Sequence, residues 1–82
     1  MIIVNVDVPM LGETLDFQID ENTPVYEVQE EMIDIICRKN SCELIGDEQR
    51  MLLWDVERRV LLRRDLTAQE NRLVTGSHLV LT

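Results

Sequence analysis

Hydrophobic and polar residues alternate through most of the first nineteen positions of the chain, with one interruption at residues 9–13. In residues 2–8, every second position from Val4 to Val8 is valine, and in residues 14–19 every second position from Leu15 to Ile19 is apolar. A period of two is typical of a half-buried β-strand. The interruption contains a proline and a glycine, which favour a turn. The pattern therefore predicts a β-hairpin with one apolar face.

The period changes to that of a helix after Thr23-Pro24. Threonine can accept a hydrogen bond from a first-turn N–H group, and proline is well tolerated at the first helical position. The residues expected to lie on the sheet are Val25, Val28, Met32, Ile35 and Ile36. A second apolar group, about 80–120° from Val25 around the helix, consists of Tyr26, Ile33 and Cys37. This flank is covered either by the following loop, through Leu44 and Ile45, or by a partner protein or a second copy of the chain.

The second half of the chain predicts three short strands. Residues 51–54 and 60–62 are apolar and enclose a charged turn, residues 63–72 are polar and irregular, and residues 77–82 alternate after a glycine. A short apolar run cannot be oriented by periodicity alone, so Leu52 and Val80 can face the core or the solvent. We expect one domain, residues 1–82, of the α+β class, with the order ββαββ, an irregular turn, and a final strand.

The charge distribution narrows the classes of partner. The net charge is −8, with twelve acids and two bases in residues 1–49, and four acids and six arginines in residues 50–82. An acidic chain is a poor ligand for nucleic acid or an anionic membrane surface. No apolar run approaches the length of about 20 residues that crosses a bilayer, and no export signal precedes the first strand. We expect a cytoplasmic protein without direct membrane insertion.

No pattern in the sequence predicts catalysis. There is no phosphate-binding glycine loop, no Ser-His-Asp or Cys-His arrangement and no metal-ligand spacing. Cys37 and Cys42 are expected to be reduced thiols in a chain that carries no export signal. A disulfide between them and a redox role for Cys37 are the open alternatives. We therefore expect no catalytic residue, no metal and no cofactor.

Two segments resemble ubiquitin. Asp47-Glu48-Gln49-Arg50-Met51-Leu52-Leu53 resembles its D-Q-Q-R-L-I-F, and Ser77-His78-Leu79-Val80-Leu81 resembles its T-L-H-L-V-L. The resemblance implies a β-grasp fold, in which a mixed sheet wraps over one helix. It also implies a protein-binding surface on the outer face of the sheet. The residues that align with this surface are Leu11, Leu52, His78 and Val80.

The chain is also similar to the YukD/EsaB family of small bacterial ubiquitin-like proteins. The similar segments are Met1 to Pro9, Thr14-Leu15-Asp16-Phe17, Pro24 to Ile36, and Val74 to Leu81, and the given chain stops at Thr82 without a diglycine. The resemblance implies a non-enzymatic docking or regulatory protein of a type VII secretion apparatus, bound to a membrane component and not conjugated to other proteins. A ubiquitin-like adaptor outside secretion is the alternative.

The arginines of the second half form another candidate surface. Those near the 51–62 hairpin are Arg50, Arg58, Arg59, Arg63, Arg64 and Arg72. Planar guanidinium groups bind carboxylates in pairs of hydrogen bonds, so these residues are candidates for contact with an acidic partner. The alternative is ordinary solvation, with partial neutralisation by Asp55, Glu57 and Asp65.

Overall fold

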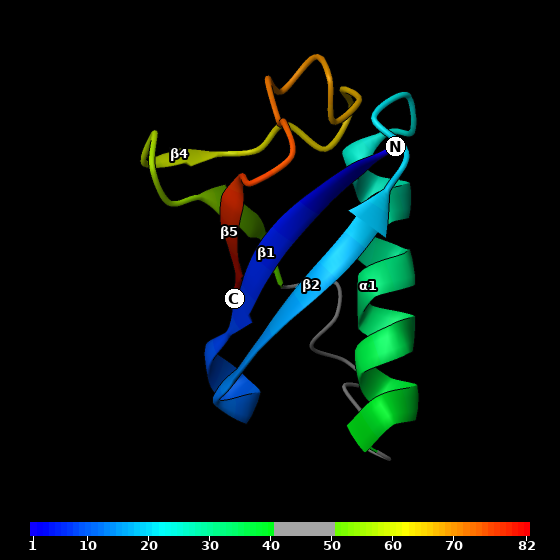
Figure 1. Ribbon diagram of the computed structural model, residues 1–82, viewed down its shortest axis with the longest axis vertical. Helices are drawn as coiled ribbons and strands as arrows, with labels where there is room; N and C mark the ends of the chain where they lie inside the picture. The colour runs from blue at the N-terminus through cyan, green and yellow to red at the C-terminus, as the bar shows by residue number, and fades with distance from the viewer. Residues whose placement is uncertain (41–50) are drawn as a thin grey trace.

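The computed structural model describes residues 1–40 and 51–82, which form a five-stranded mixed sheet with one helix across one face (Figure 1). The elements are β1 (Ile2–Val8), the 3-10 turn η1 (Pro9–Leu11), β2 (Glu13–Ile19), α1 (Val25–Asn40), β3 (Leu53–Asp55), β4 (Val60–Leu61) and β5 (His78–Leu81). The strand order is β2-β1-β5-β3-β4, with β1 parallel to β5 and the other neighbours antiparallel. This is the predicted element order.

The hairpin of β1 and β2 follows the predicted alternation. All seven residues of each strand are paired, from Ile2 opposite Ile19 to Val8 opposite Glu13. The turn closes because Gly12 takes a left-handed conformation, φ 63°, which glycine adopts without steric cost. The alternate valines of β1 are fully buried under the helix.

A distant segment of the chain caps the N-terminal end of α1. The N–H groups of Val25 and Tyr26 donate to the carbonyl oxygens of Leu66 and Arg64, at 2.9 and 3.2 Å. Among the hydrogen bonds of the described residues, none joins the Thr23 hydroxyl to a first-turn N–H group, although the sequence had predicted such a bond. The helix start is therefore fixed by tertiary contacts, which satisfy N–H groups that have no partner within a helix.

The buried face of α1 differs from the prediction at one residue. Val25, Val28, Met32 and Ile36 are buried as expected, but Ile35 is 47% exposed. The buried arc is rotated toward the other flank, where Gln29 is buried and Ile33 is 6% exposed. This flank is drawn toward β3, because Gln29 Nε2 donates to the carbonyl oxygen of Met51 at 2.5 Å. The core assignment of Ile35 is wrong, and Ile33 takes its place.

The same rotation affects the flank formed by Tyr26, Ile33 and Cys37, which is not exposed along its whole length. Ile33 belongs to the core, and Cys37 is half-buried and packs against it. Tyr26 alone is exposed. Leu44 and Ile45, the residues expected to cover this flank, lie outside the described residues.

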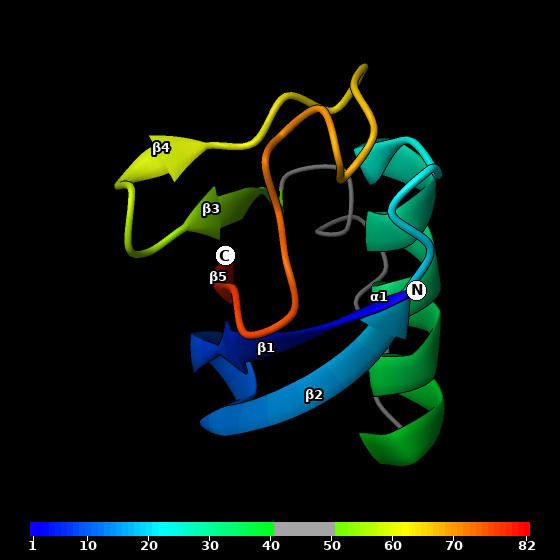
Figure 2. The same cartoon turned by 45° about the horizontal axis from the view of Figure 1, so that its top comes forward.

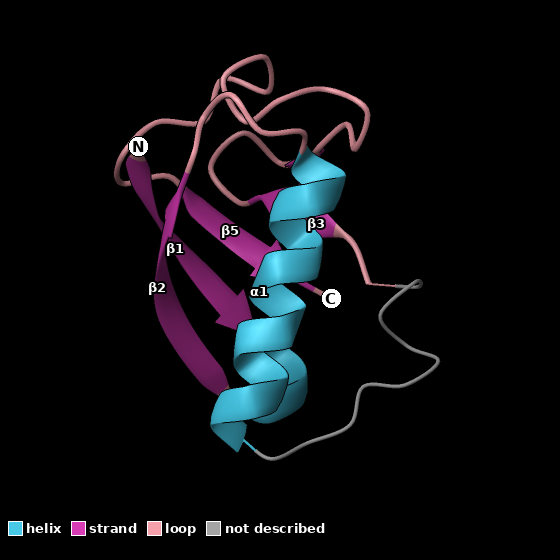
Figure 3. Ribbon diagram, turned by 90° about the vertical axis from the view of Figure 1, so that its right-hand side faces the viewer, coloured by secondary structure: helices cyan, strands magenta, loops and turns pink. Residues whose placement is uncertain are grey.

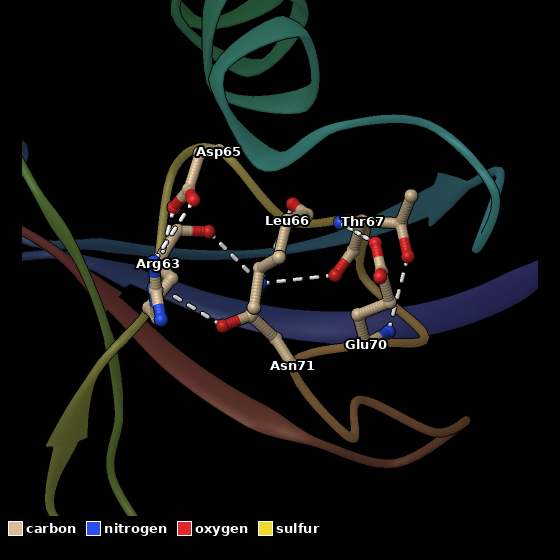
Figure 4. Close-up of polar contacts among 6 residues, drawn as sticks. All are labelled: Arg63, Asp65, Leu66, Thr67, Glu70 and Asn71. Carbon is tan, nitrogen blue, oxygen red and sulfur yellow. Dashed lines mark hydrogen bonds and ion pairs between the residues drawn. The ribbon is translucent and has the colours of Figure 1, made fainter.

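The segment between β4 and β5 is organised by the side chain of Asn71 (Figure 4). Its Oδ1 accepts from the Arg63 N–H, and its Nδ2 donates to the carbonyl oxygens of Arg63 and Thr67, each at 2.9 Å. Thr67 and Glu70 exchange reciprocal side chain–backbone hydrogen bonds at 3.0 Å, the geometry of a capping box. Because this segment supplies the helix cap, Asn71 supports the start of α1.

The corrected helix face is tested by a pair of aspartate substitutions. We expect Ile33→Asp to lower the free energy of unfolding by about 3 kcal/mol or more, since it buries an unpaired carboxylate. Ile35→Asp is the matched control, with an expected change of less than about 0.5 kcal/mol at an exposed position. Chemical denaturation followed by circular dichroism measures both. A larger loss for Ile35→Asp would restore the original assignment.

A second pair of variants tests the role of Asn71. Asn71→Ala removes three strong side-chain hydrogen bonds from the segment that caps α1, and we expect it to cost about 1–3 kcal/mol of stability. Gln69→Ala, at an exposed neighbouring position, is the control and should change little. Equal melting temperatures for the two variants would show that the segment holds its shape without Asn71.

Candidate functional site

The strand register places one row of side chains across the whole sheet, on the face opposite the helix. Asp7 is paired with Thr14 of β2 and with Val80 of β5, Val80 with Trp54 of β3, and Trp54 with Leu61 of β4. The sequence neighbours of these residues in β1, β3 and β5 are buried. Since side chains alternate between the two faces of a sheet, the row lies on the outer face.

The part of the row on β5, β3 and β4 is apolar. Trp54 and Leu61 are 39% and 44% exposed, and Val80 is half-buried. Leu52 extends this surface, because it exchanges two hydrogen bonds with Thr82 beside β5, at 2.8 and 3.0 Å, and lies two residues before Trp54. We refer to Leu52, Trp54, Leu61 and Val80 as the apolar patch. An accessible indole beside three aliphatic side chains is suited to binding another protein surface.

The part of the row on β1 and β2 is polar, and its groups are paired. The Asp7 carboxylate accepts hydrogen bonds from the Thr14 hydroxyl and from His78 Nε2, the latter at 2.9 Å. Two hydrogen bonds lower the pKa of Asp7 below its ordinary value of 3.8: the bond from Thr14 has the larger effect, and the bond from His78 the next largest. We refer to Asp7, Thr14 and His78 as the polar cluster. It gives the apolar patch a charged margin with fixed geometry.

Three of the four residues predicted by the ubiquitin resemblance meet on this face. Leu52, His78 and Val80 lie there, which settles the orientation of Leu52 and Val80 away from the core. Leu11 lies in the η1 turn, half-buried and packed against the core. Trp54 and Leu61 were not among the predicted site residues. The available signal was the tryptophan, since tryptophan is enriched in protein interfaces.

The helix flank brings four other predicted residues together. Among the described residues, Tyr26, Ile33, Cys37 and Arg64 line a cavity of about 410 Å³, together with polar side chains of α1. This places Arg64 beside the helix rather than with the other arginines. A role for these residues in partner binding stays a prediction, and the core position of Ile33 leaves it little surface to offer.

The remaining arginines have different environments. Arg58 holds the structure together: its Nε donates to the buried Asp55 carboxylate at 2.9 Å, and its Nη2 to the carbonyl oxygens of Asn71 and Arg72, each at 2.7 Å. Arg63 pairs with Asp65 at 3.0 Å. Arg58 and Arg63 are thus partly neutralised by Asp55 and Asp65, as in the alternative to partner binding. Arg59 is exposed on the β3–β4 turn. Arg50 and Cys42 lie outside the described residues.

Two further observations concern the described part of the chain alone. Within residues 1–40 and 51–82, no group of three or more His, Cys, Asp or Glu side chains is placed to hold a metal ion. No helix in these ranges is long and apolar enough to span a membrane.

The polar cluster predicts a measurable titration. The pKa of Asp7 should lie below 3.8 in the folded protein, and both Thr14→Val and His78→Ala should raise it, since each removes a hydrogen bond to the charged form. Stability from these bonds is present above the unfolded-state pKa and is lost as the pH falls through the lower folded-state value. NMR titration of the carboxyl carbon measures the shift. Gln18→Ala, on the same face, is the control, and an unchanged pKa in both test variants would contradict the assignment.

The similarity of this chain to known proteins lies in its fold. No protein-family model matches the chain, and no curated protein matches it. Among solved structures, a ubiquitin-like domain from Arabidopsis thaliana superposes with a TM-score of 0.73 at 18% identity, covering 99% of this chain and 74% of that chain. The ubiquitin of Caldiarchaeum subterraneum gives 0.70 at 15% identity, covering 98% and 89%.

A protein designed on the template of human erythrocytic ubiquitin is also similar, with a TM-score of 0.70 at 24% identity over 100% of this chain and 90% of that chain. Likeness at these identities establishes the fold and leaves function to the surfaces. The mixed five-stranded sheet over one helix is a ubiquitin-like β-grasp fold.

Proposed function

We propose that this domain is a non-enzymatic docking module that binds a partner protein through the outer face of its sheet. The observation that supports this most strongly is the apolar patch, where Trp54 and Leu61 remain 39% and 44% exposed. Tryptophan is among the residues that dominate binding energy in protein interfaces. Burial of apolar surface contributes about 25 cal/mol per Å², so covering the patch would drive association.

The polar cluster is suited to orient the bound partner. Asp7 and His78 lie at the margin of the patch, and their mutual contact holds both side chains in place at 2.9 Å. Polar groups at the rim of an interface contribute more to orientation and partner choice than to affinity. A partner that fits would present apolar side chains to Trp54 and polar groups to the β1 side.

The more specific proposal is that the partner belongs to a bacterial type VII secretion apparatus. It is supported by the resemblance to the YukD/EsaB family over the first hairpin, the helix and the last strand. In this proposal the protein is cytoplasmic, reaches the membrane only through its partner and is not conjugated. An adaptor function outside secretion would use the same surface and is distinguished by the identity of the partner.

Affinity capture with matched variants tests the docking proposal. We expect the wild-type protein to capture a partner from cells of its own source. Trp54→Asp should reduce the amount of captured partner by about tenfold or more. Val74→Asp is the control, because Val74 is an exposed apolar residue outside the patch, and it should capture normally. Both variants should keep the wild-type melting temperature. Equal capture by the two variants would place the interface elsewhere.

Identification of the captured protein separates the two specific readings. The secretion proposal is supported if the captured protein is a membrane ATPase or another component of the secretion machinery, and if Trp54→Asp no longer captures it. A partner without any link to secretion supports the adaptor reading and leaves the docking surface intact.

A further inference from the structure

The two edges of the sheet differ in how well they are protected. The strand order puts β2 at one edge and β4 at the other. β4 contains two residues, and arginines precede and follow it. β2 contains seven residues, paired one for one with β1, so it has no bulge, and it contains neither proline nor lysine. Short length, bulges, proline and charged side chains, above all lysine, are the usual defences of an edge strand. Of these, β2 has only the acidic side chains of Glu13 and Asp16.

The free backbone groups of β2 can be assigned from the bonds of its neighbour. In β1, the Asn5 N–H donates to Ser77, and the Ile3 carbonyl accepts from Gly76, each at 2.9 Å. The odd-numbered residues of β1 thus bond toward β5, and the even-numbered ones toward β2, because backbone groups alternate along a strand. The partners of the even-numbered residues in β2 are 13, 15, 17 and 19.

Thr14, Asp16 and Gln18 consequently point their N–H and C=O groups away from the sheet. All three residues are exposed, and within the described residues no hydrogen bond reaches these backbone groups. Figures 2 and 3 show the edge open, with β2 as the outermost strand and α1 packed on the inner face. An extended segment from another molecule can pair with outward backbone groups of this kind.

The helix supplies a second wall beside this edge. Gln29 faces Met51 before β3. At 100° per residue, Glu31 and Ile35 lie on the opposite flank of α1, which is the β2 side of the helix. Both side chains are exposed. An added strand would place alternate side chains toward this flank and the others toward the outer face. The exposed Ile35, which the core does not use, would then contact an apolar residue of the partner.

The charge of this region selects the partner. Glu13, Asp16 and Asp20 lie on or directly after β2, and Glu27 and Glu31 lie on the exposed side of α1. The N-terminal ammonium group of Met1 pairs with Glu21, just after β2, at 2.9 Å. Arg38 and Lys39 are in the last turn of the helix, and Arg38 pairs with Asp34. Opposite charges on neighbouring strands stabilise their pairing, and like charges directly opposite destabilise it.

A second copy of the chain fits poorly at the same edge. Antiparallel pairing of β2 with itself about residue 16 places Asp16 opposite Asp16, and each chain carries a net charge of −8. We propose that the open edge of β2 is a strand-addition site for an extended, basic segment of a partner protein, in which lysine or arginine alternates with apolar residues. This surface is distinct from the apolar patch, and its failure would leave the docking proposal untouched.

The test uses a synthetic nine-residue peptide that alternates lysine and valine, blocked at both ends. Amide hydrogen exchange of the ¹⁵N-labelled protein is measured by NMR with and without the peptide. We expect the amides of Thr14, Asp16 and Gln18 to exchange at least about tenfold more slowly in its presence, since pairing protects them. A peptide with glutamate in place of lysine, and one with proline in place of valine, should give no protection.

Charge-reversal variants provide the second arm. Asp16→Lys should weaken binding of the lysine–valine peptide by about tenfold or more, and Glu31→Lys should also weaken it. Glu57→Lys makes the same change in net charge on the exposed β3–β4 turn and should not affect binding. Melting curves establish that each variant is folded before its binding is compared.

Three results would overturn the proposal. The first is exchange at the three outward amides that the lysine–valine peptide does not slow. The second is an equal loss of peptide binding in Glu57→Lys and Asp16→Lys, which would show that binding depends only on the net charge of the protein. The third is protection of these amides in the protein alone, rising with its concentration and accompanied by a dimer in sedimentation, which would make a second copy the occupant.

Discussion

The parallel pairing of β1 with β5 is the contact on which the rest of the structure depends. It joins two segments from opposite halves of the chain through the bonds of Asn5 to Ser77 and of Gly76 to Ile3. The buried valines of β1 and the buried leucines of β5 then form one layer under the helix. Closing such a long loop costs entropy before the contact contributes, so the apolar layer has to supply the driving force. Without this pairing, β3 and β4 would have no strand to extend.

The same pairing creates the candidate binding surface. Register on one face of a sheet determines register on the other, because side chains alternate. Burial of Leu79 and Leu81 under the helix places His78 and Val80 outside, next to Asp7 and Trp54. A slip of β5 by one residue would bury His78 and Val80 and expose Leu79 and Leu81. The core thus specifies the outer face, and the outer face is free to vary in chemistry as long as its residues tolerate a sheet.

The sequence was sufficient for the elements with long periodic patterns. The first hairpin and the start of α1 were predicted within one or two residues, since each pattern has several turns or alternations to read. The rotation of α1 was harder, because isoleucine stands at both 33 and 35 and local periodicity admits either as core. The hydrogen bond from Gln29 to Met51, which orients the helix, is a tertiary contact. The orientation of Leu52 and Val80 was undecidable for the same reason, since it follows from the pairing of β3 with β5.

Other features had partial signals. The Thr67-to-Glu70 spacing of a capping box is readable in the sequence, but the role of Asn71 as the centre of that segment is not, since its partners become neighbours only on folding. Arg58 resembles the other arginines in sequence and differs from them only through the buried Asp55. Charged residues are therefore the least predictable part of the surface, because their role depends on which carboxylate or carbonyl the fold brings close.

The central claim, that the outer face binds a partner, is tested most directly by NMR cross-saturation in the complex. The domain is deuterated except for its methyl groups and the Trp54 indole, and the bound partner is irradiated. Signal loss should concentrate at Leu52, Leu61, Val80 and the indole, while the buried methyl groups of Val4 and Leu79 keep their intensity. Loss concentrated at methyl groups of α1, with an unaffected Trp54 indole, would contradict the account.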